Sequence, residues 1–110
     1  MIRLITRGKF TESYVNGLIA APEDREPVVR KLVESVGGKL INFYVTTGDS
    51  DFVLIAEADD AESILAGLMA ATAAGTISDT SSARAWTPAE FKVVAQKASK
   101  AAYRAPGKKK

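Results

Sequence analysis

Asp49 and Asp51 place two carboxylates close together inside the segment Gly48-Asp49-Ser50-Asp51. Two close carboxylates supply the oxygen ligands that divalent cations prefer. Aspartates are also common in turns, where the carboxylate accepts hydrogen bonds from nearby backbone N–H groups. No further acidic residue follows at a fixed spacing to complete a cation site, so we expect a turn here and no metal.

Histidine and cysteine are both absent from the 110 residues. Without cysteine the chain has no disulfide, no thiol nucleophile and no thiolate metal ligand, which suits a reducing compartment. Without histidine it lacks the commonest general base, the commonest metal ligand and the usual proximal haem ligand. No catalytic set stands out, and we expect no cofactor.

A second group of side chains combines guanidinium groups, aromatic rings and an amide, all in segments with strand patterns. Alternate residues of a strand share one face of a sheet, so one choice of parity brings these side chains together on the face away from the helices. Guanidinium groups bind planar anions and stack on aromatic rings. We predict that a small anionic or aromatic compound binds among Arg3, Arg7, Asn42, Tyr44, Arg84 and Trp86. The inclusion of the last two assumes that Ala83 and Ala85 point toward the helices.

A β-hairpin is the centre of the predicted sheet. Two runs rich in β-branched and aromatic residues, Leu40–Thr47 and Phe52–Ala58, flank the turn segment 48–51. With the turn centred on Asp49 and Ser50, Phe43 is expected opposite Ala56. One face of the hairpin is then wholly apolar, with Ile41, Phe43, Val45, Phe52, Leu54 and Ala56. The other face mixes apolar and hydrogen-bonding groups, with Leu40, Asn42, Tyr44, Thr46, Val53, Ile55 and Glu57.

The other segments complete an α+β pattern. We expect a strand at 2–8, a short helix capped by Thr11, a helix at about 25–36, the hairpin, a helix capped by Asp59 or Asp60, an edge strand at 76–86 and a helix opened by the capping box Thr87-Pro88-Ala89-Glu90. The order β-α-β-β-α-β plus a C-terminal helix is typical of the ferredoxin-like fold, with a four-stranded antiparallel sheet and both crossover helices on one face.

The opposite face of the sheet is too apolar for water alone. A second copy of the same sheet is the simplest cover, so we expect a homodimer with facing sheets. In a purely structural alternative, Arg3, Arg84 and Glu57 form ion pairs across that interface while Tyr44 and Trp86 pack in it, and no ligand binds.

Charge is unevenly distributed behind a net charge of +2. Residues 1–91 carry 8 basic and 13 acidic side chains, whereas residues 92–110 carry 7 basic and no acidic ones. Such a tail suggests nucleic acid or an anionic surface, but a solvated helix with a disordered end has the same composition. No base-reading or stacking motif accompanies it, so we expect no nucleic-acid partner. Without a membrane-spanning run or a signal peptide, we expect a cytoplasmic protein with no membrane partner.

Six segments of the chain match a known family in sequence and spacing. They are Ile5-Thr-Arg-Gly-Lys-Phe-Thr-Glu12, Ala21-Pro-Glu23, Val36-Gly-Gly-Lys-Leu40, Phe43-Tyr-Val-Thr-Thr-Gly48, Asp51-Phe-Val-Leu-Ile-Ala-Glu57 and Ala83-Arg-Ala-Trp-Thr87. On these segments, residues 1–95 resemble the GYD domain family, small bacterial proteins of the dimeric α/β-barrel type. In the motif that names the family a tyrosine usually precedes the aspartate; Ser50 stands there in this chain, while Gly48 and Asp51 are present.

The resemblance implies a ferredoxin-like domain over residues 1–95 and a homodimer or higher homo-oligomer. Residues 96–110 are atypical of the family, and their composition predicts a basic C-terminal helix extension with a disordered tail. It implies no particular activity. Proteins of similar architecture include cofactor-free monooxygenases, isomerases and haem-degrading enzymes, of which the haem-using ones are disfavoured here by the lack of histidine. A ligand-binding or assembly module is the favoured interpretation. The alternative is a cofactor-independent monooxygenase or isomerase that uses Asn42, Tyr44, Arg84 and Trp86 to polarise its substrate.

Overall fold

The structure is a computed structural model of the chain and describes residues 1–107. Helices and strands follow one another in the predicted order. Their bounds are β1 Ile2–Phe10, α1 Glu12–Ala20, α2 Glu26–Ser35, β2 Lys39–Val45, β3 Phe52–Ala58, α3 Ala61–Ala73, β4 Ile77–Ala85 and α4 Pro88–Ser99.

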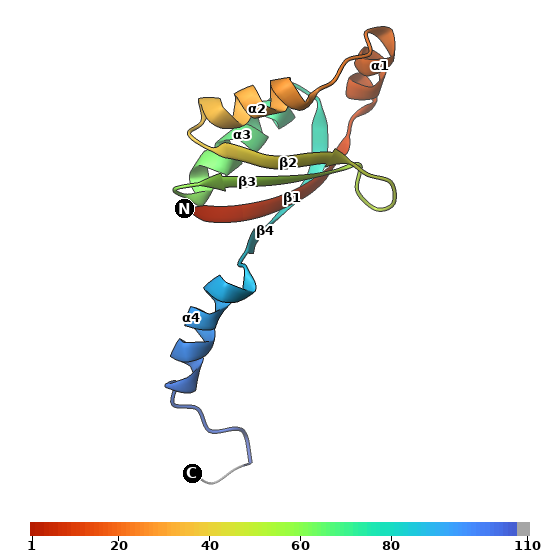
Figure 1. Cartoon of the computed structure of the whole chain (residues 1–110). Coiled ribbons are helices and arrows are strands. Elements are labelled where there is room, and N and C mark those ends of the chain that lie inside the picture. Colours follow the sequence, from red (N-terminus) through yellow and green to blue (C-terminus); the bar gives the residue numbers. More distant parts are fainter. Residues whose placement is uncertain (108–110) are drawn as a thin grey trace.

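One antiparallel sheet of four strands organises the fold, in the order β2-β3-β1-β4. Helices α2 and α3 lie on one face of this sheet, α1 lies beyond its end, and α4 projects away from the body (Figure 1). The predicted α+β, ferredoxin-like βαββαβ fold with a C-terminal helix is therefore confirmed. We call the side of the sheet under α2 and α3 the helix face, and the opposite side the open face.

The helix ends follow the capping chemistry of the sequence. Thr11 accepts a hydrogen bond from the Tyr14 N–H and caps α1, and Asp60, one of the two predicted caps, accepts from Ser63 and caps α3. The predicted capping box opens α4, with Thr87 and Glu90 bonding each other's backbone. Helix α4 contributes no buried residue. The disordered end that the sequence predicts comprises residues 104–110. Residues 104–107 form no helix or strand, and residues 108–110 lie outside the described part of the chain.

The core lies between the sheet and helices α2 and α3. Its buried apolar side chains are Leu4, Val33, Leu40, Phe52, Leu54, Ala56, Ala58 and Ile64. Phe52 is the central aromatic residue, with its ring centroid 5.4 Å from that of Phe10 and 6.1 Å from that of Phe43. Gly8 lies opposite Phe52 on β1, and a Cβ atom at Gly8 would lie 2.7 Å from the Phe52 ring. Only glycine therefore leaves room for this ring.

The predicted register of the hairpin is wrong. Phe43 lies opposite Leu54 rather than Ala56, because the loop is centred one residue earlier in the chain than expected. The pairing also shifts between Leu40 and Asn42, so Ile41 is an extra residue in a β-bulge. The bulge turns Leu40 toward the helix face, where it is 2% exposed, although its predicted place was the mixed face. Ile41, predicted to be in the apolar face, is exposed instead.

Candidate functional site

The open face is crossed by three rows of side chains, because residues paired across an antiparallel sheet point to the same side. The row at one end contains Lys39, Glu57, Arg3 and Ala85. The middle row contains Asn42, Ile55, Ile5 and Ala83. The row at the other end contains Tyr44, Val53, Arg7 and Ser81. An apolar centre thus lies between a charged row and a row that contains a phenol and a guanidinium group on either side of Val53.

The open face carries four of the six predicted ligand-binding residues: Arg3, Arg7, Asn42 and Tyr44. Arg84 is not among them, since it lies opposite the buried Leu4 and so belongs to the helix side of the sheet. Trp86 is beside Arg84, whose guanidinium carbon lies 4.9 Å from the ring centroid. The assumed parity of the last strand was wrong, because Ala83 and Ala85 pair with Ile5 and Arg3 on the open face. The four residues proposed to polarise a substrate are therefore split between two faces.

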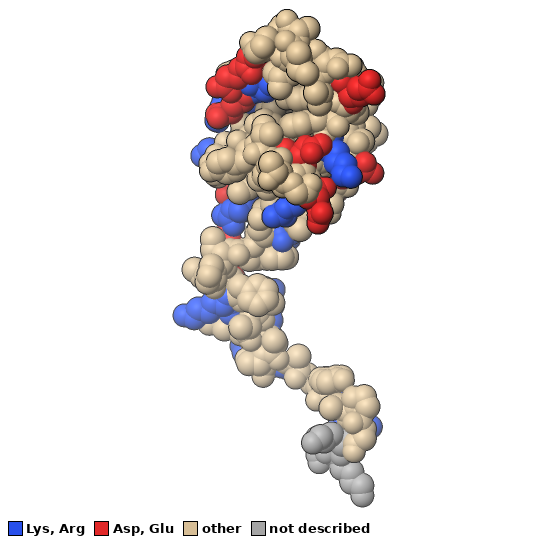
Figure 2. All heavy atoms as spheres, turned by 90° about the vertical axis from the view of Figure 1, so that its right-hand side faces the viewer, with Lys and Arg blue, Asp and Glu red and all other residues tan. Residues whose placement is uncertain are grey.

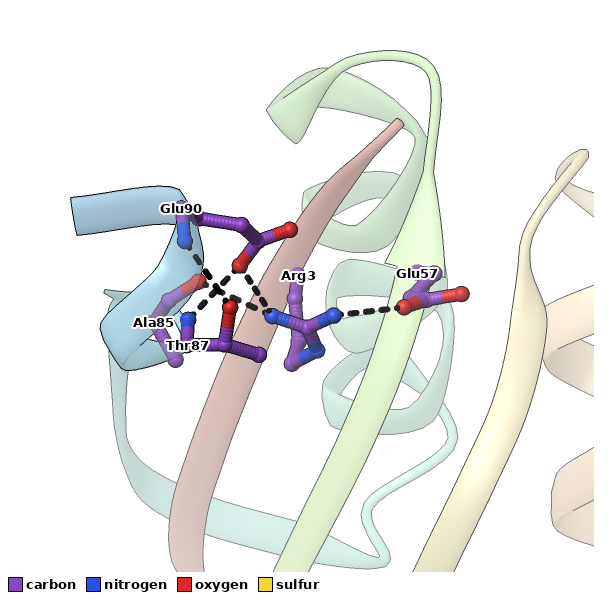
Figure 3. A network of polar contacts seen from close by, with 5 residues as sticks. All are labelled: Arg3, Glu57, Ala85, Thr87 and Glu90. Atoms are coloured by element: carbon purple, nitrogen blue, oxygen red, sulfur yellow. Dashed lines mark hydrogen bonds and ion pairs between the residues drawn. The ribbon is translucent and has the colours of Figure 1, made fainter. Parts of the chain in front are cut away.

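Arg3 is engaged in a network that joins the sheet to α4 (Figure 3). Its guanidinium group lies 3.1 Å from a carboxylate oxygen of Glu57 on β3 and 2.9 Å from one of Glu90 on α4. The same oxygen of Glu90 accepts a hydrogen bond from the Thr87 backbone N–H at 2.7 Å. The Thr87 N–H and the Arg3 guanidinium lower the pKa of Glu90. Arg3 therefore holds the start of α4 at the sheet rather than presenting a free guanidinium group to a ligand.

A prediction follows for the titration of Glu90. Its lowered pKa means that the network with Arg3 is intact above the ordinary glutamate range and is lost as the pH falls through the lowered value. Arg3→Met should raise the pKa of Glu90 toward its ordinary value, since the cation is removed while the capping N–H stays. NMR titration of the Glu90 carboxyl carbon measures this, with Arg30→Met on α2 as the control. If the Glu90 carboxyl group titrated with the same midpoint pH in Arg3→Met and in wild type, the ion pair between Arg3 and Glu90 would be contradicted.

Arg7, Asn42 and Tyr44 are polar groups of the open face that have capacity left for a ligand and lie beside its apolar centre. Arg7 is exposed and makes no ion pair with any residue among 1–107. The Asn42 side-chain amide donates to the Tyr44 hydroxyl oxygen at 3.2 Å, which leaves the hydroxyl hydrogen available to donate. Tyr44 and Arg7 flank Val53 in one row, about 10 Å apart by strand spacing. They can contact opposite sides of one small molecule.

Of the two aspartates in the hairpin loop, Asp51 has a structural role. Within residues 1–107, no three acidic side chains are grouped closely enough to hold a metal ion. Asp51 instead joins the loop to the end of β1: its carboxylate accepts a hydrogen bond from the Phe10 N–H at 3.0 Å, and its own N–H donates to the Gly8 carbonyl at 2.8 Å. Asp51 is thus a structural residue: two of its bonds reach the neighbouring strand β1, and its carbonyl closes the loop by accepting from the Thr46 N–H at 2.8 Å.

Asp51→Ala is expected to lower the free energy of unfolding by about 1–3 kcal/mol, because the Phe10 N–H loses a charged acceptor. Urea denaturation measures the change. Asp49→Ala is the matched control, since Asp49 is exposed in the same loop, and its effect should stay within about 0.5 kcal/mol. Equal losses in the two variants would count against the assigned role of Asp51.

On the face of the body that Figure 2 shows, acidic and basic side chains are intermixed, whereas further along the projecting α4 the visible charged side chains are basic. The cations of α4 are Lys92 and Lys97, both exposed. None of the helices in residues 1–107 has the length and the apolar character needed to cross a bilayer.

Comparisons with known proteins bear on the fold and on the family. The structure is similar to TTHA0845 from Thermus thermophilus, with a TM-score of 0.50 and 14% identity over 79% of this chain and 95% of that one. It is also similar to FFRP-DM1, with a TM-score of 0.48 and 16% identity over 78% of this chain and 100% of that one. No curated protein matches the sequence. The sequence model of the GYD domain matches residues 4–95, which include β2, β3, β4 and all but the first two residues of β1, and the chain therefore belongs to the GYD domain family.

Proposed function

We propose that the protein is a homodimeric binding module in which two copies pair through their open faces and a small anionic or aromatic compound lies between them, beside Arg7, Asn42 and Tyr44. The observation that carries the proposal is the apolar centre of the open face. Helices α2 and α3 both lie on the other side of the sheet, and no segment of residues 1–107 covers this centre.

The side chains of the open face suit a contact between two sheets. Ile5, Val53 and Ile55 are half-buried and adjacent, and Tyr44 is 54% exposed. Burying the exposed part of such side chains is favourable by about 25 cal/mol for each Å² of apolar surface removed from water. A two-fold axis through the middle row would bring this centre against its own copy, since a symmetric interface uses the same surface twice.

The projecting α4 leaves the open face accessible to a second copy. Arg3 binds Glu90 at the first turn of α4, at one end of the sheet, and the helix then extends away from the strands. A C-terminal helix folded back under the sheet would occupy the surface that the dimer needs. The Arg3–Glu90 contact disfavours a position of α4 over the open face, because it fixes the first turn of the helix at the end of the sheet.

The cleft between two facing sheets would contain one cation from each copy. Ser81 lies opposite Arg7 on β4, and its small side chain leaves space next to the guanidinium group. Bringing two Arg7 side chains into a partly desolvated interface costs free energy unless an anion accompanies them. An aromatic anion meets this need, because it also packs on Val53 and receives the hydrogen bond that Tyr44 can donate.

Sedimentation velocity of the full chain, together with calorimetric titration with salicylate, tests the proposal. We expect a species of twice the chain mass at micromolar concentration, and salicylate binding that is lowered about tenfold in Arg7→Met, because a charge-assisted contact is removed. Lys31→Met on α2 is the control and should bind as wild type. A monomer at these concentrations would refute the pairing, and equal affinity in Arg7→Met and wild type would refute the ligand site.

A further inference from the structure

A cavity of about 290 Å³ lies on the other side of the sheet, between α2, α3 and the helix face. It is separate from the open face. Its wall is almost entirely apolar, with Val29 and Val33 from α2 and Leu68 and Ala71 from α3. An apolar cavity of roughly 150 Å³ already holds a benzene ring, so this one has room for a bicyclic aromatic body.

Aromatic side chains from four elements line one side of this cavity. Tyr14 of α1 stacks on Phe10 of β1 with ring centroids 4.2 Å apart, and Phe10 stacks on Phe52 of β3 at 5.4 Å. Phe43 of β2 continues the series. Aromatic rings interact favourably with further rings in offset or edge-to-face arrangements. This wall therefore favours a flat aromatic ligand.

Arg25 contributes the one charged side chain that residues 1–107 place in the cavity lining. Its Nη1 donates to a carboxylate oxygen of Glu23 at 2.6 Å, and its guanidinium carbon lies 5.7 Å from the centre of the Tyr14 ring. Its Nε is buried and has no hydrogen-bond partner among the described residues. Nε is too enclosed for a ligand atom to reach, so the donors open to a ligand are those of Nη2, which makes no hydrogen bond to a described residue on a side chain that is 31% exposed. A guanidinium group with unused donors is suited to a carboxylate.

From the cavity, the aromatic wall and Arg25 together, we infer that this helix-side cavity binds an aryl carboxylate, with the rings against Phe10 and Phe52 and the carboxylate at Arg25. The site goes beyond the proposed function, since it lies across the sheet from the open face and needs no second copy of the chain. One chain would bind one molecule.

Calorimetric titration of the full chain with naphthoate tests the site, with naphthalenemethanol as an uncharged probe of similar shape. We expect naphthoate to bind about tenfold more tightly than the alcohol, because only the carboxylate can accept from Arg25 as a charged group. Arg25→Met should weaken naphthoate about tenfold and leave the alcohol unchanged. No heat with naphthoate, or equal affinity for both probes in wild type, would overturn the proposal.

Filling the cavity supplies a second test that does not depend on charge. Ala71→Leu places a larger side chain in the cavity and should weaken both probes at least about tenfold, whereas Ala66→Leu on the exposed side of the same helix should change neither. If Ala71→Leu does not fold, Gly67→Ala replaces it, since a Cβ at Gly67 would meet Val36 at an ordinary 3.6 Å. Equal affinities in the filled variant and the Ala66→Leu control would place the ligand elsewhere.

Arg7→Met separates this site from the open face. It should leave naphthoate binding at one site per chain unchanged, even if salicylate binding between the sheets is lost. Loss of naphthoate in Arg7→Met together with its retention in Arg25→Met would overturn the helix-side site and leave the open-face proposal standing.

Discussion

Ile55→Lys is expected to convert the protein from a dimer to a monomer. Ile55 lies in the middle row of the open face, between Asn42 and Ile5, so in the proposed dimer it is close to the two-fold axis. The substitution brings two like charges, one from each copy, into an apolar interface. Burying the lysine of each copy should weaken the free energy of association by at least about 1.4 kcal/mol. Since the dimer contains two such lysines, its dissociation constant should rise at least about a hundredfold.

The isolated subunit should tolerate this change. Ile55 is half-buried on a face that is open in the single chain, and a lysine can cover the neighbouring apolar surface with its methylene groups while its ammonium group reaches water. Sedimentation velocity over a concentration series measures dissociation, and circular dichroism checks the fold. Met69→Lys on α3, where Met69 is 65% exposed, is the matched control and should stay dimeric. A folded Ile55→Lys protein that sediments as wild type would rule out the open face as the interface.

Phe52→Ala should lower the free energy of unfolding by about 3–5 kcal/mol, a large fraction of the stability of a small domain. Phe52 is 3% exposed and its ring is stacked against Phe10, so truncation removes buried contacts and enlarges the neighbouring cavity. Urea denaturation measures the loss.

A double-mutant cycle with Gly8 tests why the ring is placed there. Gly8→Ala alone should cost about 1–3 kcal/mol, because the added Cβ would lie 2.7 Å from the ring atoms of Phe52. In the Phe52→Ala background the same change should cost much less, since the clash is gone. Gly17→Ala, where a Cβ meets nothing within 4 Å, serves as the control. Additive losses at Gly8 and Phe52 would mean that Gly8 is required for another reason.

The sequence specified the fold because several local signals agreed. The capping residues Thr11 and Asp60 and the capping box at Thr87 all begin helices in the structure, and the hairpin forms between the two predicted strands. The edge position of β4 was also predictable, since its polar and small side chains do not suit a central strand. Element type and order thus follow from short-range chemistry.

The site was only partly predictable, because it depends on parity and on pairing across the sheet. No proline or glycine near Ile41 indicates the bulge. Because Leu40 and Ile41 are equally apolar, the hydrophobic pattern of the strand does not show which of the two faces the helices. In β4 the run from Ser78 to Ala85 has no apolar alternation to fix its parity. The pairing with β1 also shifts near Gly8, where Asp79 has a positive φ of 52°. Arg84 was misplaced for this reason.

The helix-side cavity could not be inferred from the sequence either. Its wall combines residues from seven elements, and a periodic apolar stripe on α2 looks the same whether or not its neighbours fill the space beside it. The sequence around Arg25 does not indicate that this residue lines a cavity, because an arginine beside Glu23 and Asp24 is also typical of an exposed loop.

The projecting helix also separates electric charge in space. The excess of acidic groups belongs to residues 1–91, whereas residues 92–107 carry Lys92, Lys97, Lys100 and Arg104 and no acidic side chain, in a molecule 66 Å long. This length exceeds the Debye length of about 8 Å at physiological ionic strength several-fold, so the two ends are electrostatically independent in the cell. At very low ionic strength the screening weakens, and each molecule then acts as an extended dipole whose positive arm is attracted to the negative body of another.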